Sequence, residues 1–465
     1  MLAWAASGGM ALTGYRGGAP VMSPAPAFEL LRAVSATLAS VTGQVGERVL
    51  IDPAATVFGR AGRSRRERDG RRSVGGASRI LRTADGWCAV TLARAADFEA
   101  VPAILGDATA SDAWAALTAA ARRWPARTLA ERAQLLGVPA AVVPPRPWPA
   151  DRHGGPERYR ESGSGPPPDR AEEAGTAPPS GPSRPETPSG QRCPAAGSRT
   201  EPDDNLPGTA SRPMDRLFAN TLPWNTSRLA AAVPEAALRD CLVVDLSALW
   251  AGPLCARLLA AAGARVVKVE SVHRPDSGRA WSPEFFRWLH EGKEFRSVEF
   301  RTEAGRRELA ALLDAADIVV EAARPRALAH LGLAPEQLRH RPGRVWLSLT
   351  GYGRAEPMRV AFGDDAAAAG GLLGWGVDGP MFCGDAIADP LSGICAALAV
   401  ATAVRAGGGV LLDLSMRATA AAFAAAPAIE HGPHRVVRHG GGWSVECAAS
   451  EHNQPVLAPP AGAGC

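Results

Sequence analysis

The sequence is poor in lysine and carries little net charge. Lysine occurs only at Lys268 and Lys293, so arginine supplies nearly all of the 51 basic residues. The formal net charge is +4 over 465 residues. A charge this small for the length gives no indication of a nucleic-acid-binding surface. We therefore expect no nucleic-acid partner.

The cysteines show no metal-binding or disulfide pattern. Eight are scattered along the chain without a C-x-x-C pair, which argues against zinc and a disulfide framework and predicts a reducing, cytoplasmic location. The sequence has no run of about 20 apolar residues, the length that a membrane span needs. The apolar start, MLAWAASGGMALTG, has no basic segment before it and recurs later in the chain. It is therefore interpreted as part of a fold, not as a signal peptide.

Two stretches about 360 residues apart resemble each other. The match is without gaps from MALTGYRGGAPVMSPAPAFELLRAVSATLASVTG to GLLGWGVDGPMFCGDAIADPLSGICAALAVATAV, and it places Leu12, Gly14, Pro20 and Leu38 on Leu372, Gly374, Pro380 and Leu398. After a small shift, 50–52 matches 411–413, and 80–90 matches 436–447. The repeat predicts two incomplete copies of one domain, the first without its beginning and the second without its end.

Composition divides the chain into three parts. Residues 144–213 are rich in Pro, Gly, Ser and charge, with almost no large aliphatic side chains, so they cannot bury enough surface to fold. We predict a disordered linker with a typical span of roughly 45 Å. It separates a first domain at 1–143, which is the partial copy, from a second at 214–465.

From residue 240 the pattern is α/β. Apolar strands are predicted at 242–247, 266–270, 317–322 and 344–353, with helices at 252–264 and 303–316. Strands alternating with helices at this spacing indicate right-handed crossovers and a parallel sheet. Ligands of such sheets bind beyond the carboxyl ends of the strands. These ends correspond to segments near 248–253, 270–279, 321–325 and 350–354.

The first strand–helix turn, SALWAGPL at 247–254, lacks the G-x-G-x-x-G dinucleotide pattern. Gly252 and Pro253 could still present helix N–H groups to a phosphate. An ordinary helix start explains the same residues equally well.

The order of motifs resembles family III CoA-transferases, the group of formyl-CoA and carnitine CoA-transferases and α-methylacyl-CoA racemases. The resemblance rests on VVDLSALWAGPLCARLLAAAGARVVKVES, DSGR, EGKEFRSVEF, ADIVVEAARP, LGL and LSLTGYG, in that order from about 240. Residues 73–93 and 129–143 are similar to the later portion of the same family. The resemblance implies a Rossmann-like parallel-sheet large domain plus a smaller α+β domain, here permuted or fused with a partial duplication.

The resemblance also implies a catalytic residue, Asp389, in the turn AIADPLSGI. Its carboxylate would attack a CoA thioester and form a covalent aspartyl-CoA. From the residues alone, Asp-Pro before an apolar helix is typical of a helix cap. One residue can fill both roles. In the first copy the equivalent is Glu29, which we interpret as structural.

Further site residues follow from the resemblance. Gly75 and Gly76 match the mobile glycine loop that covers the nucleophile, although a plain turn is an equal alternative. Resemblance assigns coenzyme A binding to Arg279, Arg324, Gly351 and Gly353, together with the turn at Gly252 and Pro253. Arginine suits phosphate because its planar guanidinium is always charged. The cluster at 63–72 is interpreted as solvated surface.

Some residues depart from the family pattern. His290 stands upstream of Lys293 where the family often has asparagine, and Glu321-Ala322 replaces Val-Glu-Asn. No histidine occurs at 361–371, where the racemases have a base. Racemisation needs acid/base groups on both faces of the α-carbon. The leading hypothesis is therefore CoA transfer between an acyl-CoA and a carboxylic acid, with no metal.

Two alternatives stay open at this point. One is an acyl-CoA racemase or isomerase, and the other is a degenerate CoA-binding subunit without turnover. The resemblance further implies a homodimer, with acyl-CoA and carboxylate substrates.

Overall fold

We describe a computed structural model of the chain, for residues 2–21, 26–107, 112–145, 217–218, 222–234, 236–426, 434–440, 442–447 and 453–461. The predicted linker at 144–213 lies outside these residues, apart from 144 and 145.

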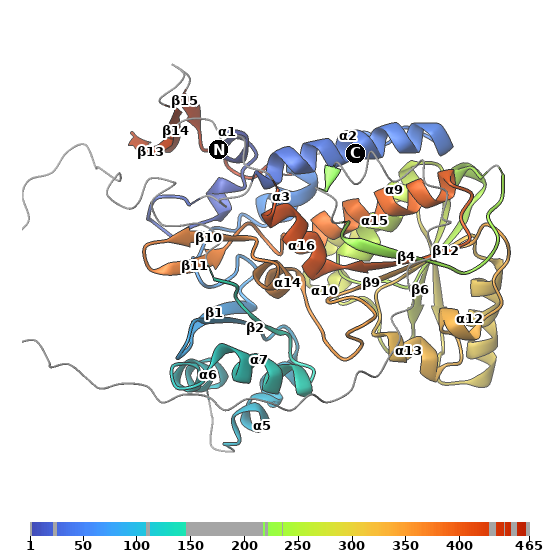
Figure 1. Ribbon diagram of the computed structural model, residues 1–465, viewed down its shortest axis with the longest axis horizontal. Coiled ribbons are helices and arrows are strands. Elements are labelled where there is room, and N and C mark those ends of the chain that lie inside the picture. Colours follow the sequence, from blue (N-terminus) through green and yellow to red (C-terminus); the bar gives the residue numbers. More distant parts are fainter. Residues whose placement is uncertain are drawn as a thin grey trace, which may run out of the picture.

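A seven-stranded sheet forms the centre of the described chain (Figure 1). All its strands run parallel except β4, which pairs antiparallel with β12 at one edge. In spatial order the strands are β4 (Trp224–Arg228), β12 (Val410–Ser415), β9 (Val345–Thr350), β8 (Ile318–Glu321), β5 (Leu242–Asp245), β6 (Arg265–Ser271) and β7 (Glu294–Val298).

The chain reverses its direction of travel across this sheet between β5 and β8. It runs outward from β5 through β6 to β7, returns to β8 beside β5, and continues to β9. A crevice opens at the carboxyl ends of strands where the order reverses, and this is where ligands of open α/β sheets bind. The turns after β5 and β8 therefore border the expected ligand crevice.

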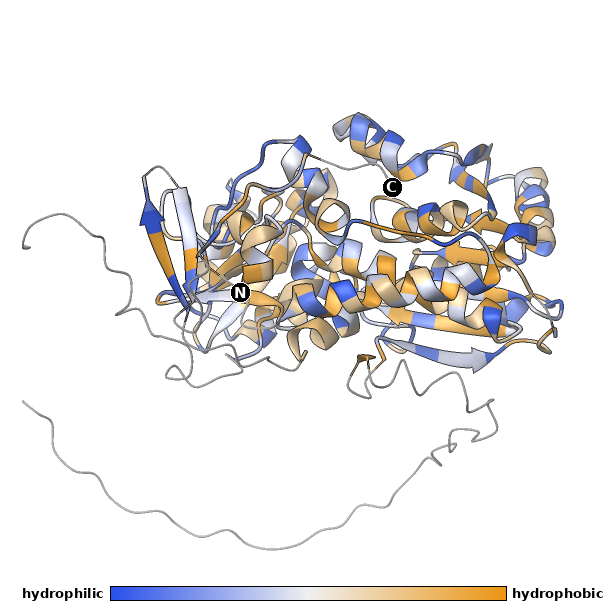
Figure 2. Ribbon diagram, turned by 90° about the horizontal axis from the view of Figure 1, so that it is seen from above, coloured by the Kyte–Doolittle hydropathy of each residue, from blue (hydrophilic) through white to orange (hydrophobic). Residues whose placement is uncertain are grey.

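Helices cover both faces of the sheet. Val243 and Val244 point to opposite faces because side chains alternate along a strand. Val243 packs with α9 (Ala251–Ala261) and α15 (Ala388–Arg405), whereas Val244 packs with α12 (Glu303–Ala315) and α13 (Pro325–His330). In Figure 2 apolar residues dominate the inner elements and hydrophilic ones gather on outer helices. This is the predicted Rossmann-like α/β fold class, which is confirmed.

Local sequence explains where these elements begin and end. Helix α12 starts after Thr302, whose hydroxyl accepts a hydrogen bond from the Gly305 amide at 3.0 Å. The strand predicted to reach 353 stops at Thr350, because Gly353 has φ +89° and turns the chain. Two short 3-10 turns, η3 (Leu238–Asp240) and η4 (Pro335–Gln337), precede β5 and β9.

The first segment of the chain packs into the same core as the later segment. It contains α1 (Leu2–Ala6), η1 (Met10–Leu12), α2 (Ala27–Val45) and α3 (Pro53–Arg63). Helix α2 lies along α15 (Figure 1), and Leu38 and Leu398, which the repeat aligns, are both fully buried in one cluster. The hydrophobic core thus crosses the predicted boundary between 1–143 and 214–465.

The repeated stretches form corresponding elements in the same order. Helix α2 corresponds to α15, and α3 to α16 (Met416–Ala424). The bridge from Gly14 to Pro20 corresponds to the hairpin of β10 (Leu373–Gly376) and β11 (Gly379–Phe382). The hairpin of β1 (Ser78–Arg82) and β2 (Trp87–Thr91) corresponds to β13 (His434–His439) and β14 (Gly442–Cys447), which β15 (Asn453–Pro455) extends.

A smaller α+β unit is built from the rest of the first segment. Strands β1, β2 and β3 (Ala140–Val142) form an antiparallel sheet. Helices α4 (Ala95–Glu99), α5 (Val101–Leu105), α6 (Ala113–Ala121) and α7 (Ala126–Leu135) surround one face. Its own core includes Leu81, Val90, Ile104, Leu117 and Leu129. The other face meets the β10–β11 hairpin through Ile80, Ala89, Leu373 and Phe382.

One described helix, α15, is long and apolar enough by length and composition to cross a membrane. In the protein, 78% of this helix, Ala388–Arg405, is buried. A core helix that is covered on all sides has the same composition, and α15 is packed between α9, α2 and the sheet.

Candidate active site

Asp389 lies in the first turn of α15, directly after a strained turn. Gly384 has φ +73° and Ala386, which is not glycine, has φ +45°. Such backbone conformations cost energy and cluster at functional sites. The N-cap of α15 is Ile387, and no side chain caps this helix. The capping role that the Asp-Pro pattern suggested for Asp389 is therefore not present.

The Asp389 carboxylate contacts the start of α14 (Gly363–Ala369). The Gly363 amide donates a hydrogen bond to it, and a Cβ on Gly363 would lie 2.5 Å from Oδ2 and 2.3 Å from the Ala386 carbonyl oxygen. Only glycine lets the backbone approach the carboxylate so closely. The carboxylate is thus held against a backbone donor on one side, while the residue as a whole is only half-buried.

The surroundings raise the pKa of Asp389 to about 7. Removal from water has the largest effect, and the negative charges of Asp364 and Asp385 act in the same direction. Arg60 and the Gly363 amide oppose them. At neutral pH, therefore, a substantial fraction of Asp389 is ionised, and that fraction is more basic than an ordinary aspartate.

Two neighbouring aspartates link Asp389 to the small domain. Asp364 is buried and accepts hydrogen bonds from Ser78 Oγ at 3.0 Å and the Ala386 amide at 2.9 Å. Asp365 accepts from Thr91 Oγ1 at 2.9 Å. Burial raises the pKa of Asp365 to about 8 and also raises that of Asp364. Asp365 is consequently mostly protonated at neutral pH, which limits the negative charge of the site.

Arg60, on α3, is a site residue that sequence reasoning missed. Its guanidinium forms a forked ion pair with buried Asp385, Nε to Oδ2 at 2.7 Å and Nη2 to Oδ1 at 2.5 Å. It also lies over the Trp250 ring, 4.4 Å from the centroid. An arginine in a helix whose neighbours Val57, Phe58 and Ala61 are buried was the available signal.

The predicted glycine loop reaches the same place. A Cβ on Gly75 would lie 3.8 Å from Asp385 Oδ1 and 3.9 Å from Arg60 Nη2. Gly76 has φ +83°, which favours glycine. The structure therefore brings together Asp389, the turn that precedes it, and the loop at 73–76.

Gly252 and Pro253 lie in the first turn of α9, which follows β5. A Cβ on Gly252 would clash with the Ser247 side chain at 2.2 Å, and Leu249 has φ +73°. Lys293 holds this turn in place, since its Nζ donates to the Pro253 carbonyl at 2.9 Å and to Asp245 Oδ2 at 3.0 Å. Helix α15 packs closely on the start of α9, where a Cβ on Gly393 would lie 2.7 Å from the Ala251 carbonyl oxygen. The first turn of α9 and helix α15 are therefore neighbours.

The two predicted coenzyme-binding arginines follow different strands of the sheet, β6 and β8. Arg279, in α10 (Gly278–Trp281), donates to Glu270 Oε2 at 2.7 Å and lies 4.3 Å from the Phe286 ring centroid. Arg324 follows β8 and reaches the Gly137 carbonyl of the small domain at 3.5 Å. Partial burial lowers the pKa of Arg324, and the positive charges of Arg326, Arg94 and Arg274 lower it further. The positive charges around Arg324 favour binding of an anion such as a phosphate there.

Gly351 and Gly353 form a tight turn after β9. A Cβ on Gly351 would lie 2.7 Å from the Ala361 Cβ. A Cβ on Gly353 would lie 3.6 Å from Asp413 Oδ2. These glycines allow the segment that leads to Gly363 to pass close to the strand end. Their placement supports a steric role for both residues.

The departures from the family pattern have local explanations. His290, at the end of α11 (Pro283–His290), is buried, and burial lowers its pKa, although Asp276 Oδ2 lies 3.8 Å away. Glu321 is buried 3.5 Å from Arg354, and burial raises its pKa to about 7. His290 is consequently neutral at pH 7, whereas a substantial fraction of Glu321 is ionised there. Glu29 is half-buried on α2 and makes no hydrogen bond or ion pair with the described residues.

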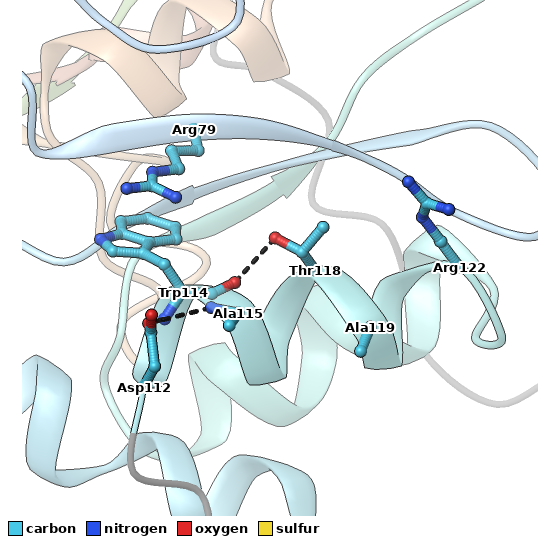
Figure 3. Close-up of a pocket in the computed structure, with 7 residues that line it drawn as sticks. All are labelled: Arg79, Asp112, Trp114, Ala115, Thr118, Ala119 and Arg122. Atoms are coloured by element: carbon cyan, nitrogen blue, oxygen red, sulfur yellow. Dashed lines mark hydrogen bonds between the residues drawn. The ribbon is translucent and has the colours of Figure 1, made fainter.

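A separate pocket of about 640 Å³ opens between β1 and α6 (Figure 3). Arg79 lies over the Trp114 ring there, 4.4 Å from its centroid, and Asp112 caps α6. Because residues alternate along β1, Arg79 faces α6 whereas Ser78 faces Asp364. This pocket is thus on the opposite side of the small sheet from Asp389. Among the described residues, no cluster of His, Cys, Asp or Glu is arranged to hold a metal ion.

Comparison with known proteins identifies the later segment. Residues 238–451 match the family model described as CoA-transferase family III, so this segment is similar to that family. An acyl-CoA transferase of Fusarium pseudograminearum is 34% identical over 167 residues, which are 32% of this chain and 37% of that protein. The succinyl-CoA–D-citramalate CoA-transferase of Chloroflexus aurantiacus is 32% identical over 200 residues, which are 39% of this chain and 50% of that protein.

The chain thus spans half the length, or less, of these two relatives. Among solved structures, a CaiB/BaiF family protein from Brucella suis is 25% identical with a TM-score of 0.41. That match covers 46% of this chain and 66% of the other.

Proposed function

We propose that the protein transfers coenzyme A from an acyl-CoA to a carboxylic acid through a thioester on Asp389. The observation that carries the proposal is the setting of Asp389. Within the segment that matches the family model, this carboxylate follows a strained turn, contacts the Gly363 amide and has a pKa raised to about 7. The names of the curated relatives describe CoA transfer, which supports the same reaction class.

The first half of the reaction would use Asp389 as a nucleophile. A carboxylate oxygen attacks the thioester carbonyl and the C–S bond breaks. Coenzyme A leaves as a thiolate, and the acyl group stays on Asp389 as a mixed anhydride. The thiolate then attacks the aspartyl carbonyl of that anhydride. The C–O bond breaks, the first acid leaves as a carboxylate, and an aspartyl-CoA thioester is formed.

The second half repeats these steps with another acid. Its carboxylate attacks the aspartyl-CoA carbonyl, and the thiolate leaves again. The thiolate then attacks the acyl carbonyl of the new anhydride, which gives the product acyl-CoA and restores the Asp389 carboxylate. No proton has to be supplied or removed, so the residues around the site need only position the groups and exclude water.

Each neighbour has a role consistent with this chemistry. The Gly363 amide holds one Asp389 oxygen, and burial makes the ionised carboxylate more basic than usual. The loop with Gly75 and Gly76 lies where it could shield an anhydride from hydrolysis. We assign coenzyme A binding to the crevice bordered by Gly252, Pro253, Arg279, Arg324, Gly351 and Gly353.

Trapping with hydroxylamine tests the proposal. The protein is incubated with succinyl-CoA or acetyl-CoA and quenched with hydroxylamine, and the peptide at 385–405 is searched for a hydroxamate. We expect a hydroxamate on Asp389 that depends on the thioester and disappears in Asp389→Asn. Asp378→Asn, in an exposed turn, is the matched control and should behave like the parent protein.

Other outcomes identify the alternatives. Exchange of an α-proton of the acyl group in deuterated water, without a hydroxamate, would indicate a racemase or isomerase. Tight coenzyme A binding without a hydroxamate or exchange of labelled coenzyme A would indicate a non-catalytic subunit. A homodimer and a cytoplasmic location stay proposals from the family resemblance and the cysteine pattern.

A further inference from the structure

Arg60 comes from the part of the chain before the predicted linker, yet it contacts the turn that precedes Asp389. It lies on α3, where Asp52 caps the helix by accepting hydrogen bonds from the Ala54 and Ala55 amides at 2.9 and 3.1 Å. Its side chain is only 11% exposed, and its ion-pair partner Asp385 is 0% exposed. An arginine buried to this degree needs a specific purpose or a complete set of partners.

The guanidinium is fixed in both position and orientation. The two bonds to Asp385 define the plane of its fork, which is the geometry that arginine forms with a carboxylate. Trp250, next to the first residue of α9, covers it at 4.4 Å, and Trp281 lies at 5.7 Å. Arg60 therefore contacts three parts of the site: the turn before Asp389, the start of α9, and α10.

The charges that face Asp389 come from several elements. Asp385 belongs to the preceding turn, Asp364 to α14 and Arg60 to α3, and the Gly363 amide adds a backbone donor. Of these side chains Arg60 alone is positive, so it opposes two anions and the loss of water. Arg66, on the segment after α3, approaches Gly75 and donates to the Val74 carbonyl at 3.4 Å.

We propose that Arg60 is a positioning residue that keeps Asp389 ionised at neutral pH while it holds the turn at Asp385 in place. This inference rests on the proposed function, because an ionised Asp389 matters for catalysis only if this carboxylate is the nucleophile. Removal of Arg60 takes away the one positive side chain that lowers the pKa of Asp389 and leaves the charges of Asp364 and Asp385 unopposed there. Carboxylates so arranged retain a proton, and a protonated Asp389 cannot attack a thioester.

The first test is a direct titration that needs no turnover. Aspartate labelled with 13C at the carboxyl carbon is incorporated, and the Asp389 resonance is assigned by its loss in Asp389→Asn. We expect Arg60→Gln to raise the midpoint of this resonance by about 1–2 pH units, the effect of losing a nearby opposite charge. Arg63→Gln is the matched control on the same helix, since Arg63 contacts Ala461 and Trp288 instead. It should leave the midpoint unchanged.

A second pair of variants keeps the test decisive if Arg60→Gln does not fold. That variant leaves Asp385 buried without a partner, which is strongly destabilising, whereas replacing both members of a buried pair is tolerated better. Asp385→Asn is therefore compared with the double variant Arg60→Gln, Asp385→Asn. The two differ only at residue 60, which loses its positive charge, and the double variant should again titrate about 1–2 pH units higher. An Asp389 midpoint that is equal in both proteins overturns the inference.

The pH dependence of turnover distinguishes control of the Asp389 charge from a purely structural role of Arg60. A midpoint raised from about 7 by one or two units lowers the ionised fraction at pH 7 by about 5- to 50-fold. We expect the rate of Arg60→Gln to fall by this factor at pH 7 and to recover as the pH is raised. A rate that stays low at every pH contradicts the proposed role. Failure to trap a hydroxamate in the parent protein would overturn the proposed function, while the titration still decides whether Arg60 controls the charge of Asp389.

Discussion

Gly363 and Asp389 are in such close contact that a Cβ at 363 would lie 2.5 Å from the Asp389 Oδ2. The same atom would lie 2.3 Å from the Ala386 carbonyl oxygen, which is backbone and cannot swing aside. One methyl group would therefore displace either the carboxylate or the strained turn that carries it. Two residues 26 positions apart in the sequence thus fix the place of the proposed nucleophile.

Gly363→Ala should reduce turnover by about 100-fold or more, because a displacement of about 1 Å at a reacting group has an effect of this size. Steady-state kinetics with succinyl-CoA measure the change. Gly86→Ala is the control, since a Cβ at Gly86 meets nothing within 4 Å. Wild-type kinetics in Gly363→Ala would show that the contact has no importance for catalysis.

The rate should depend on pH through Asp389. Because the carboxylate must be ionised to attack, and burial raises its pKa to about 7, kcat/KM should rise with pH up to about 7 and then level off. Below the midpoint it should fall about tenfold per pH unit. A profile that is flat between pH 5 and 8 would contradict a nucleophile with this pKa.

Asp389→Asn should make the protein more stable at pH 8. The folded state holds the proton of Asp389 up to about pH 7, whereas the unfolded chain releases it near 3.8. The unfolded state therefore binds fewer protons between these values, and stability falls as pH rises through this window. Asparagine removes the effect, so we expect a gain of roughly 1–3 kcal/mol at pH 8, reduced from the full shift because the residue is partly exposed.

Chemical denaturation at pH 8 and at pH 3.5 measures this gain. The gain should vanish at the lower pH, because Asp389 is then protonated in both states. An Asn variant that is less stable at pH 8, together with full activity, would assign the residue a structural role.

The buried pair of Lys293 and Asp245 should stabilise the fold mainly because each charge compensates the other. Both side chains are 0% exposed. Burial alone would raise the pKa of Asp245, but Lys293 and Lys268 outweigh it and hold the pKa at about 2. Stability from this group is therefore present above about pH 4 and is lost as pH falls toward 2.

Lys293→Met should lower the free energy of unfolding by about 3–5 kcal/mol, because it leaves Asp245 buried beside fewer positive charges. Adding Asp245→Leu should restore part of the loss. Denaturant titrations of the two single variants and the double variant measure the coupling. Losses that simply add in the double variant would mean that the two side chains do not stabilise each other.

Much of the fold could be predicted from local patterns. The β-branched runs at 242–247 and 317–322 and the amphipathic segment at 303–316 became β5, β8 and α12, because strand and helix periodicity reflect burial on the sheet. The repeat aligned Leu38 with Leu398, and both belong to helices that pack side by side. Short-range signals were sufficient for these elements.

The composition of the site could be predicted only in part. Asp389 lies in a motif that resemblance identifies, whereas Arg60 lies in no motif and meets Asp385 across 325 residues. Asp364 and Asp365 occur in a segment that was considered only for its missing histidine. Their burial against Ser78 and Thr91 depends on how the small domain packs on α14, which periodicity does not encode.

The packing of α2 against α15 has a consequence for synthesis of the protein. Helix α2 leaves the ribosome about 360 residues before its partner, which at about 5–20 residues per second is a delay of roughly 20–70 s. During that interval its apolar face, including Leu31, Val34 and Leu38, has no permanent cover. Production of this chain in the cell should therefore depend strongly on chaperones that shield nascent polypeptides.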